Sequence, residues 1–295
     1  MSKKLCWHFA LALTISLAVL ATIFISGRYA EVEPTTTTRI IRYTLTARNT
    51  TNQLIRDSHI DVFAPVQETS WQKVIDINSP HQYKLNKDSI GNQTLSFTLN
   101  LPPYAVEIIS VQASVATYSH ALTVPLENPK EFTKAEKYIE AEESSIKDKS
   151  LEMKRGGIEE TARATYDFVV SHVQETSYRR ENQGAMYALK ERKGDCTEFA
   201  YLFVALCRAN GIPARPVGGF YLPDNRSVIK GQNYHNWAEF YDGRKWRIAD
   251  PLFKHFDESS ENYINFQIQQ GETSKTFETA QKFISFDDRI ELKVN

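Results

Sequence analysis

The sequence has no excess of charge of either sign, since 35 basic residues are balanced by 36 acidic ones and the pI is about 6.7. A chain without a basic surplus has no field with which to gather the phosphate backbone of DNA or RNA. We therefore expect no nucleic-acid partner. With 295 residues, 41% of them hydrophobic, the chain is long enough for about two domains with their own cores.

Cysteine is also scarce, because the chain contains only Cys6, Cys196 and Cys207. If the last two share one helix they lie ~16 Å apart, which is too far for a disulfide or for a zinc ion shared with His235 and His255. No disulfide, metal site or organic cofactor is therefore expected. Calcium binding by scattered acidic loops stays open. Two thiols remain free and need an explanation.

Charge is missing altogether between Leu5 and Gly27, after Lys3 and Lys4. A run of this length can cross ~30 Å of hydrocarbon as a helix. It is longer than the apolar region of a typical signal peptide and lacks a good cleavage site, so we predict a membrane anchor over residues 1–28, with a cleaved signal sequence as the alternative. The lysines place the N-terminus in the cytoplasm. The rest would then be periplasmic or extracellular, and secreted if the segment is cleaved.

The chain after this segment divides into regions of different amino-acid composition. Residues 29–39 resemble a tether. Residues 40–124 contain short β-branched and aromatic runs, such as RIIRYTLTARN and QTLSFTLNL, separated by turn residues, which predicts a small β-sandwich. Residues 125–157 are highly charged and predict a solvated helical linker. A helix follows at 158–173, and further strands are expected within 212–223, 235–243, 245–251, 263–268 and 290–294.

The stretch GDCTEFAYLFVALCRANG predicts a helix over residues 196–209. Asp195 and Glu198 have the spacing of a capping box, and Gly211 followed by Pro213 ends the helix. Cys196 then lies in the first turn, where unpaired N–H groups favour a thiolate. The two acidic neighbours oppose this effect, so the thiol needs an imidazolium partner. Cys207, by contrast, fits a buried apolar position.

His235 is the candidate imidazolium partner of Cys196, and Asp250 is the candidate carboxylate that orients the His235 ring. His235 begins the strand pattern HNWAEF, and after the Asp242-Gly243 turn the chain returns as KWRIAD to Asp250. Two strands joined by so short a turn can bring the two side chains within hydrogen-bonding distance. A thiol nucleophile requires such a base, and the base requires a fixed tautomer.

The ordered motifs GDC, ANGIPAR, HNW and ADP resemble the core of the transglutaminase-like superfamily, with 39 residues between cysteine and histidine and 15 between histidine and aspartate. The matched core covers about residues 161–251. The resemblance implies an α+β, papain-like fold in which the cysteine-bearing helix packs on an antiparallel sheet, within a catalytic domain at 158–295. The anchor and the upstream sandwich are similar to those of exported bacterial members.

By the same resemblance, Cys196 attacks a carboxamide carbon, His235 transfers protons and Asp250 orients the imidazole. The Cys196 backbone N–H is expected to stabilise the oxyanion. Family members often use an upstream polar or aromatic side chain as a second donor, and Tyr178 and Gln183 are the candidates here. This mechanism requires no metal.

We therefore expect a membrane-anchored thiol enzyme that acts on amide bonds of peptides or proteins in the cell envelope, with hydrolysis favoured because water is abundant. Transamidation between glutamine and lysine side chains is the alternative chemistry. Removal of glycans by a peptide-N-glycanase-like reaction would use the same three residues. A noncatalytic module that binds envelope proteins is the alternative of another class.

Overall fold

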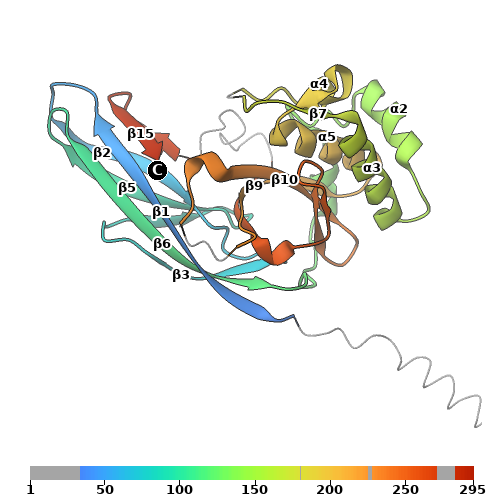
Figure 1. The fold of residues 1–295 in the computed structure, drawn as a ribbon, viewed down its shortest axis with the longest axis horizontal. Helices are drawn as coiled ribbons and strands as arrows, with labels where there is room; N and C mark the ends of the chain where they lie inside the picture. Colours follow the sequence, from blue (N-terminus) through green and yellow to red (C-terminus); the bar gives the residue numbers. More distant parts are fainter. Residues whose placement is uncertain (1–33, 180, 225–227, 271–282) are drawn as a thin grey trace, which may run out of the picture. The chain divides into compact units, whose positions relative to one another are not determined.

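The described part of the chain is an α+β arrangement of three larger antiparallel sheets and four α-helices (Figure 1). The computed structural model describes residues 34–179, 181–224, 228–270 and 283–295. The predicted anchor at 1–28 lies outside these residues. Among the helices in the described ranges, none combines the length and the hydropathy needed to cross a bilayer. The first strand begins at Thr36, inside the predicted tether.

Two four-stranded sheets contain the strands expected from the N-terminal half. The first has the order β15-β1-β6-β3, formed by Ile290–Val294, Thr36–Asn49, Val106–Tyr118 and Gln72–Asn78. The second has the order β14-β2-β5-β4, formed by Phe283–Ser285, Ile55–Ala64, Gln93–Leu101 and Lys84–Lys87. Side chains alternate between buried and exposed along β5, as expected for strands with one buried face.

A five-stranded antiparallel sheet and the helices form the rest of the described chain. The sheet has the order β12-β11-β10-β9-β13, formed by His255–Phe256, Trp246–Asp250, Tyr234–Tyr241, Ala214–Tyr221 and Tyr263–Ile268. The helices are α2 (Ser144–Met153), α3 (Ile158–His172), α4 (Ala185–Glu191) and α5 (Cys196–Ala209). A short parallel pair joins β7 (Gln174–Glu175) to β8 (Lys193–Gly194).

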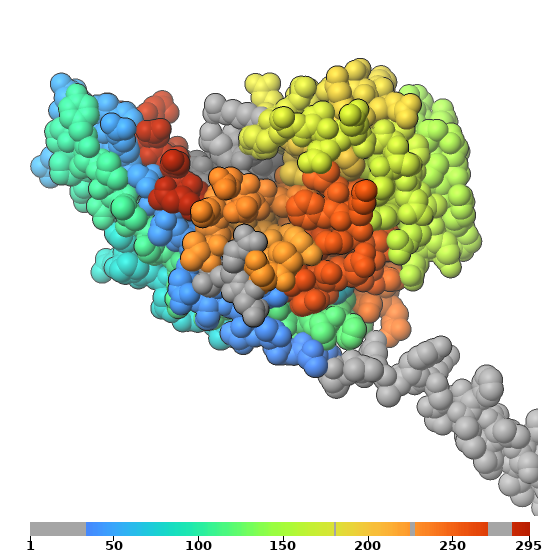
Figure 2. Space-filling view, viewed as in Figure 1, coloured from blue at the N-terminus to red at the C-terminus, as the bar shows by residue number. Residues whose placement is uncertain are grey.

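The five-stranded sheet contributes to two hydrophobic cores. Ala238 and Phe240 of β10 belong to the core built by α5 and the other helices. Ile264 and Phe266 of β13 belong to the core shared with the two four-stranded sheets. The space-filling view shows the yellow-green and yellow helical segments lying directly against the orange strands (Figure 2). Helix α5 is therefore fixed along most of its length, which fixes the position of its first residue.

Two features differ from the sequence prediction. The charged region 125–157 is not one solvated helix: it contains a 3-10 turn at Pro129–Thr133 and the ten-residue α2, and it buries Ile139 and Ile146 completely. Its apolar residues are too few to form a periodic pattern, yet they fill gaps beside α5. In addition, β14 and β15 pair with β2 and β1, so the two four-stranded sheets draw strands from the C-terminus as well as from residues 40–124.

Candidate active site

Helix α5 presents Cys196 at its first position. The predicted capping box is present: Asp195 Oδ1 accepts the Thr197 N–H at 2.9 Å, and Glu198 Oε2 accepts the Asp195 N–H at 3.1 Å. The predicted helix end is confirmed as well, with Gly211 at a φ of 77°. Cys196 is partly exposed, whereas Cys207 near the other end is buried and burial raises its pKa. Of the two cysteines in the described ranges, Cys196 is therefore the one available to a substrate.

The hairpin of β10 and β11 brings His235 and Asp250 together. His235 Nε2 lies 2.6 Å from Asp250 Oδ2. The same carboxylate oxygen accepts the Tyr263 hydroxyl at 2.8 Å, and Oδ1 accepts the Phe253 N–H at 3.1 Å. Because an ionised carboxylate can only accept, the His235 proton in this pair resides on Nε2. The other ring nitrogen, Nδ1, is left for proton exchange with Cys196.

The charge on His235 is set by opposing effects. Burial acts to lower the pKa of His235, but the Asp250 charge, the hydrogen bond to Asp250 and the interaction with Cys196 outweigh it and raise the pKa to about 9. The ring is therefore an imidazolium at neutral pH. The Phe253 ring stacks on it with 4.0 Å between ring centroids and limits its access to water. A positive charge beside a thiol favours the nucleophilic thiolate.

Glu198 offsets the positive charge of His235 less than its position in the first turn of α5 suggests. Burial raises the pKa of Glu198 to about 7, despite hydrogen bonds from the N–H groups of Gln183 and Asp195. The side chain therefore carries only part of a negative charge near neutrality.

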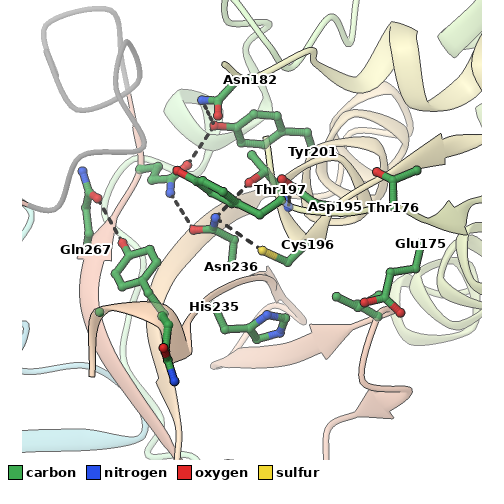
Figure 3. A pocket seen from close by; sticks show the side chains of 16 residues that line it. Glu175, Thr176, Asn182, Asp195, Cys196, Thr197, Tyr201, His235, Asn236 and Gln267 are labelled. Atoms are coloured by element: carbon green, nitrogen blue, oxygen red, sulfur yellow. Dashed lines mark hydrogen bonds between the residues drawn. The ribbon is translucent and has the colours of Figure 1, made fainter. Parts of the chain in front are cut away.

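Asn236 also contacts Cys196 and is linked to further polar side chains. Asn236 Nδ2 lies 3.8 Å from Cys196 Sγ and 3.0 Å from Thr197 Oγ1. Gln269 donates to Asn236 Oδ1, and Tyr201 donates to Gln269 Oε1. Figure 3 shows the Cys196 sulfur between the Asn236 amide and the His235 ring. The thiol therefore contacts one titratable and one uncharged polar group.

These groups line a cavity of about 390 Å³. Its wall consists largely of hydroxyl and carboxamide side chains, among them Thr176, Asn182, Tyr201, Asn236, Gln267 and Gln269 (Figure 3). Two buried polar atoms of this wall, Thr176 Oγ1 and Gln267 Nε2, have no hydrogen-bond partner within the described ranges. The cavity can therefore offer hydrogen bonds to a polar ligand next to the sulfur.

The two predicted side-chain oxyanion donors lie in different places. Tyr178 lines the cavity but is 65% exposed. Gln183 is not among the residues that line the cavity: its N–H donates to Glu198 Oε1, and its side chain donates to the Glu181 carbonyl.

Sequence reasoning missed Asn236, Gln269, Phe253 and Tyr263, although each contacts the site. Asn236 is adjacent to His235 in the HNW motif, which is the one local signal available. Tyr263 is the first residue of a strand that was predicted, β13. Nothing in the sequence indicates that this strand brings the Tyr263 hydroxyl to the Asp250 carboxylate. Such contacts arise from sheet order and not from spacing along the chain.

One family model matches part of the chain. Residues 147–251 match the model of the transglutaminase-like superfamily, so the chain contains a transglutaminase-like domain. Enzymes of this superfamily typically use Cys, His and Asp. The matched range includes Cys196, His235 and Asp250. A search of curated proteins found no match to the sequence.

Solved structures of other proteins resemble this chain to different degrees. A candidate cysteine protease from Cytophaga hutchinsonii is 17% identical and superimposes with a TM-score of 0.59, covering 88% of this chain and 92% of that one. The periplasmic domain of TgpA from Pseudomonas aeruginosa is 14% identical, with coverages of 77% and 89% and a TM-score of 0.42. The similarity to the Cytophaga hutchinsonii structure shows a shared fold.

Proposed function

We propose that this chain is a cysteine enzyme that cleaves or transfers amide bonds of peptides or proteins through a thioester on Cys196. The observation that carries the proposal is the pairing of His235 with the buried Asp250 at 2.6 Å, beside a partly exposed thiol at a helix N-terminus. An acid-base pair held in this way has the parts that nucleophilic catalysis requires.

In this proposal the Cys196 thiolate attacks the carbonyl carbon of the amide and forms a tetrahedral intermediate. The intermediate collapses when the His235 imidazolium gives its proton to the departing amine, which leaves an acyl group on sulfur. The neutral imidazole then takes a proton from water or an amine as that nucleophile bonds to the acyl carbon, and the carbon–sulfur bond breaks to release the product and the Cys196 thiolate. Asp250 keeps the ring in place through its hydrogen bond to His235, while the Cys196 N–H donates to the oxyanion.

The cavity supports a polar acyl donor such as a peptide segment. The unpaired Gln267 Nε2 is a donor for a backbone or side-chain carbonyl, and Thr176 Oγ1 can donate or accept. Hydrolysis is favoured over transfer because Cys196 is partly exposed, so water can reach the thioester. Transfer to an amine remains the alternative outcome.

We further propose that the enzyme acts outside the cytoplasm, held to the membrane by residues 5–27. The support is the uncharged run after Lys3 and Lys4. Peptides or proteins of the cell envelope are then the substrates within reach. The two four-stranded sheets would then lie on the same side of the membrane and could hold a protein substrate.

Mass spectrometry of envelope extracts tests the reaction. Extracts are incubated with the purified full chain in detergent, and with Cys196→Ala and Cys207→Ala variants. New peptide termini indicate a peptidase, a deamidation mass shift indicates an amidase, and crosslinked peptides indicate a transferase. The Cys207→Ala control is expected to behave as wild type because Cys207 is completely buried and far from the cavity.

The noncatalytic alternative makes a different prediction. Iodoacetamide labelling, resolved by residue, should modify Cys196 rapidly at pH 7 in the wild type and at least tenfold more slowly in a His235→Ala variant. Equal labelling in both proteins, together with extracts that do not differ between wild type and Cys196→Ala, would leave a binding module as the better description.

A further inference from the structure

The proposed reaction needs a second donor for the oxyanion, and the sequence left it unassigned. The first donor is the Cys196 backbone N–H, which occupies the first position of α5 and makes no hydrogen bond within the described residues. We propose that the side-chain N–H of Asn236 is the second donor. This proposal rests on the proposed function, because it concerns the tetrahedral intermediate formed on Cys196.

The distances suit this role. Asn236 Nδ2 is 3.8 Å from Cys196 Sγ and 3.0 Å from Thr197 Oγ1, so one amide hydrogen is used by Thr197 and the other is directed at the sulfur. In the intermediate, the oxyanion is bonded to the carbon that is bonded to Sγ. A donor close to the sulfur can therefore come within roughly 2.7–3.1 Å of that oxygen, the separation at which oxyanion donors act.

The orientation of the Asn236 amide is held by a chain of hydrogen bonds. Asn182 Nδ2 donates to the Tyr201 hydroxyl at 3.1 Å, and the hydroxyl donates to Gln269 Oε1 at 3.1 Å. Gln269 Nε2 in turn donates to Asn236 Oδ1 at 3.2 Å. Each link fixes which end of the next amide donates, so the Asn236 oxygen faces Gln269 and its nitrogen faces Cys196 (Figure 3). A donor fixed before the reaction needs no reorganisation during it.

The other candidates lack one of these features. Tyr178 lines the cavity but is 65% exposed, so most of its surface faces solvent. The Gln183 side chain donates to the Glu181 carbonyl and lies outside the cavity lining. Within the described residues, Asn236 is the side-chain amide with a hydrogen bond to Cys196 Sγ.

Two small reagents separate this role from a general effect on the thiol. p-Nitrophenyl acetate acylates a cysteine through a tetrahedral oxyanion: sulfur bonds to the carbonyl carbon and p-nitrophenolate leaves. Iodoacetamide alkylates by direct displacement of iodide and forms no oxyanion. Both rates are measured at Cys196 by mass spectrometry of the full chain in detergent. In Asn236→Ala, acylation should fall by about 10²-fold, while alkylation stays within about threefold of wild type.

A second variant tests the positioning chain. Gln269→Leu leaves Asn236 in place but removes the hydrogen bond that fixes the orientation of the Asn236 amide. Acylation should therefore fall by a smaller factor than in Asn236→Ala, and alkylation should not change. Gln53→Leu makes the same change at an exposed position outside the cavity lining, so this control is expected to acylate as wild type. Thermal unfolding of each variant verifies folding, and if Asn236→Ala does not fold, Asn236→Ser and Gln269→Leu provide the same comparison.

The outcomes distinguish the two proposals. Equal losses of acylation and alkylation in Asn236→Ala would overturn the donor role, as would acylation at the wild-type rate. A wild-type protein in which Cys196 is neither acylated nor alkylated faster than a free thiol would instead overturn the proposed function.

Discussion

Replacing Asp250 by Asn tests the electrostatics on which the site depends. The pKa of His235 is raised from 6.5 to about 9, which corresponds to about 3 kcal/mol in favour of the imidazolium at roughly 1.4 kcal/mol per unit. Because the pKa is higher in the folded state, this stabilisation is fully present below pH 6.5 and is lost as the pH rises through about 9. In Asp250→Asn the main source of the increase is removed and burial remains, so His235 should titrate below 6.5.

Nuclear magnetic resonance of the His235 ring measures this titration directly. We expect a midpoint near pH 9 in the wild type and below 6.5 in Asp250→Asn. At pH 7 the variant ring is then neutral, so alkylation of Cys196 should slow, and turnover should fall by as much as about 10⁴-fold because the tautomer is no longer fixed. The high-pH limit of activity near pH 9 should disappear from the variant.

Glu175→Gln is the matched control, since it removes an exposed negative charge at the same cavity that makes no hydrogen bond to His235. Its titration midpoint should stay near that of the wild type. A wild-type His235 that titrates at 6.5 or lower, or an Asp250→Asn variant with an unchanged midpoint, would refute the electrostatic argument.

Three further substitutions test the surrounding structure. Tyr263→Phe removes a hydrogen bond from the buried Asp250 carboxylate and should lower the free energy of unfolding in urea by about 1–3 kcal/mol. Gly219→Ala should lower the melting temperature because an added Cβ would lie 2.0 Å from a carbonyl oxygen of β13, whereas Gly156→Ala meets nothing within 4 Å. Glu198→Gln should flatten the pH dependence of unfolding between pH 4.5 and 7, because the raised pKa of Glu198 makes its contribution present below 4.5 and lost as the pH rises through about 7.

Each of these has a clear contrary result. A Tyr263→Phe protein as stable as wild type would mean that the hydroxyl adds nothing to Asp250. Equal melting temperatures for the two glycine variants would mean that the strands next to Gly219 can separate at no cost. An unchanged pH dependence in Glu198→Gln would mean that this carboxyl titrates normally.

Local patterns in the sequence were sufficient to predict the helix and the strands that carry the site residues. The capping box and the Gly211 stop define α5 as Cys196–Ala209, since caps are satisfied by residues within four positions of the helix end. The strand patterns also gave β9, β10, β11 and β13, because alternation along one strand depends only on that strand. The spacing of His235 and Asp250 across a short turn indicated that their side chains could meet, since a hairpin turn fixes its own register.

The tertiary structure decided what surrounds these residues. Tyr263 reaches Asp250 because β13 pairs with β9 and not with its sequence neighbours, and Gln269 reaches Asn236 for the same reason. The charge state of His235 depends on burial and on the partners around it, neither of which a linear pattern contains. The sequence alone therefore determined which residues could do chemistry, because local spacing controls helix ends and turns. Only the fold decided their hydrogen bonds and charges, because those depend on contacts between distant segments.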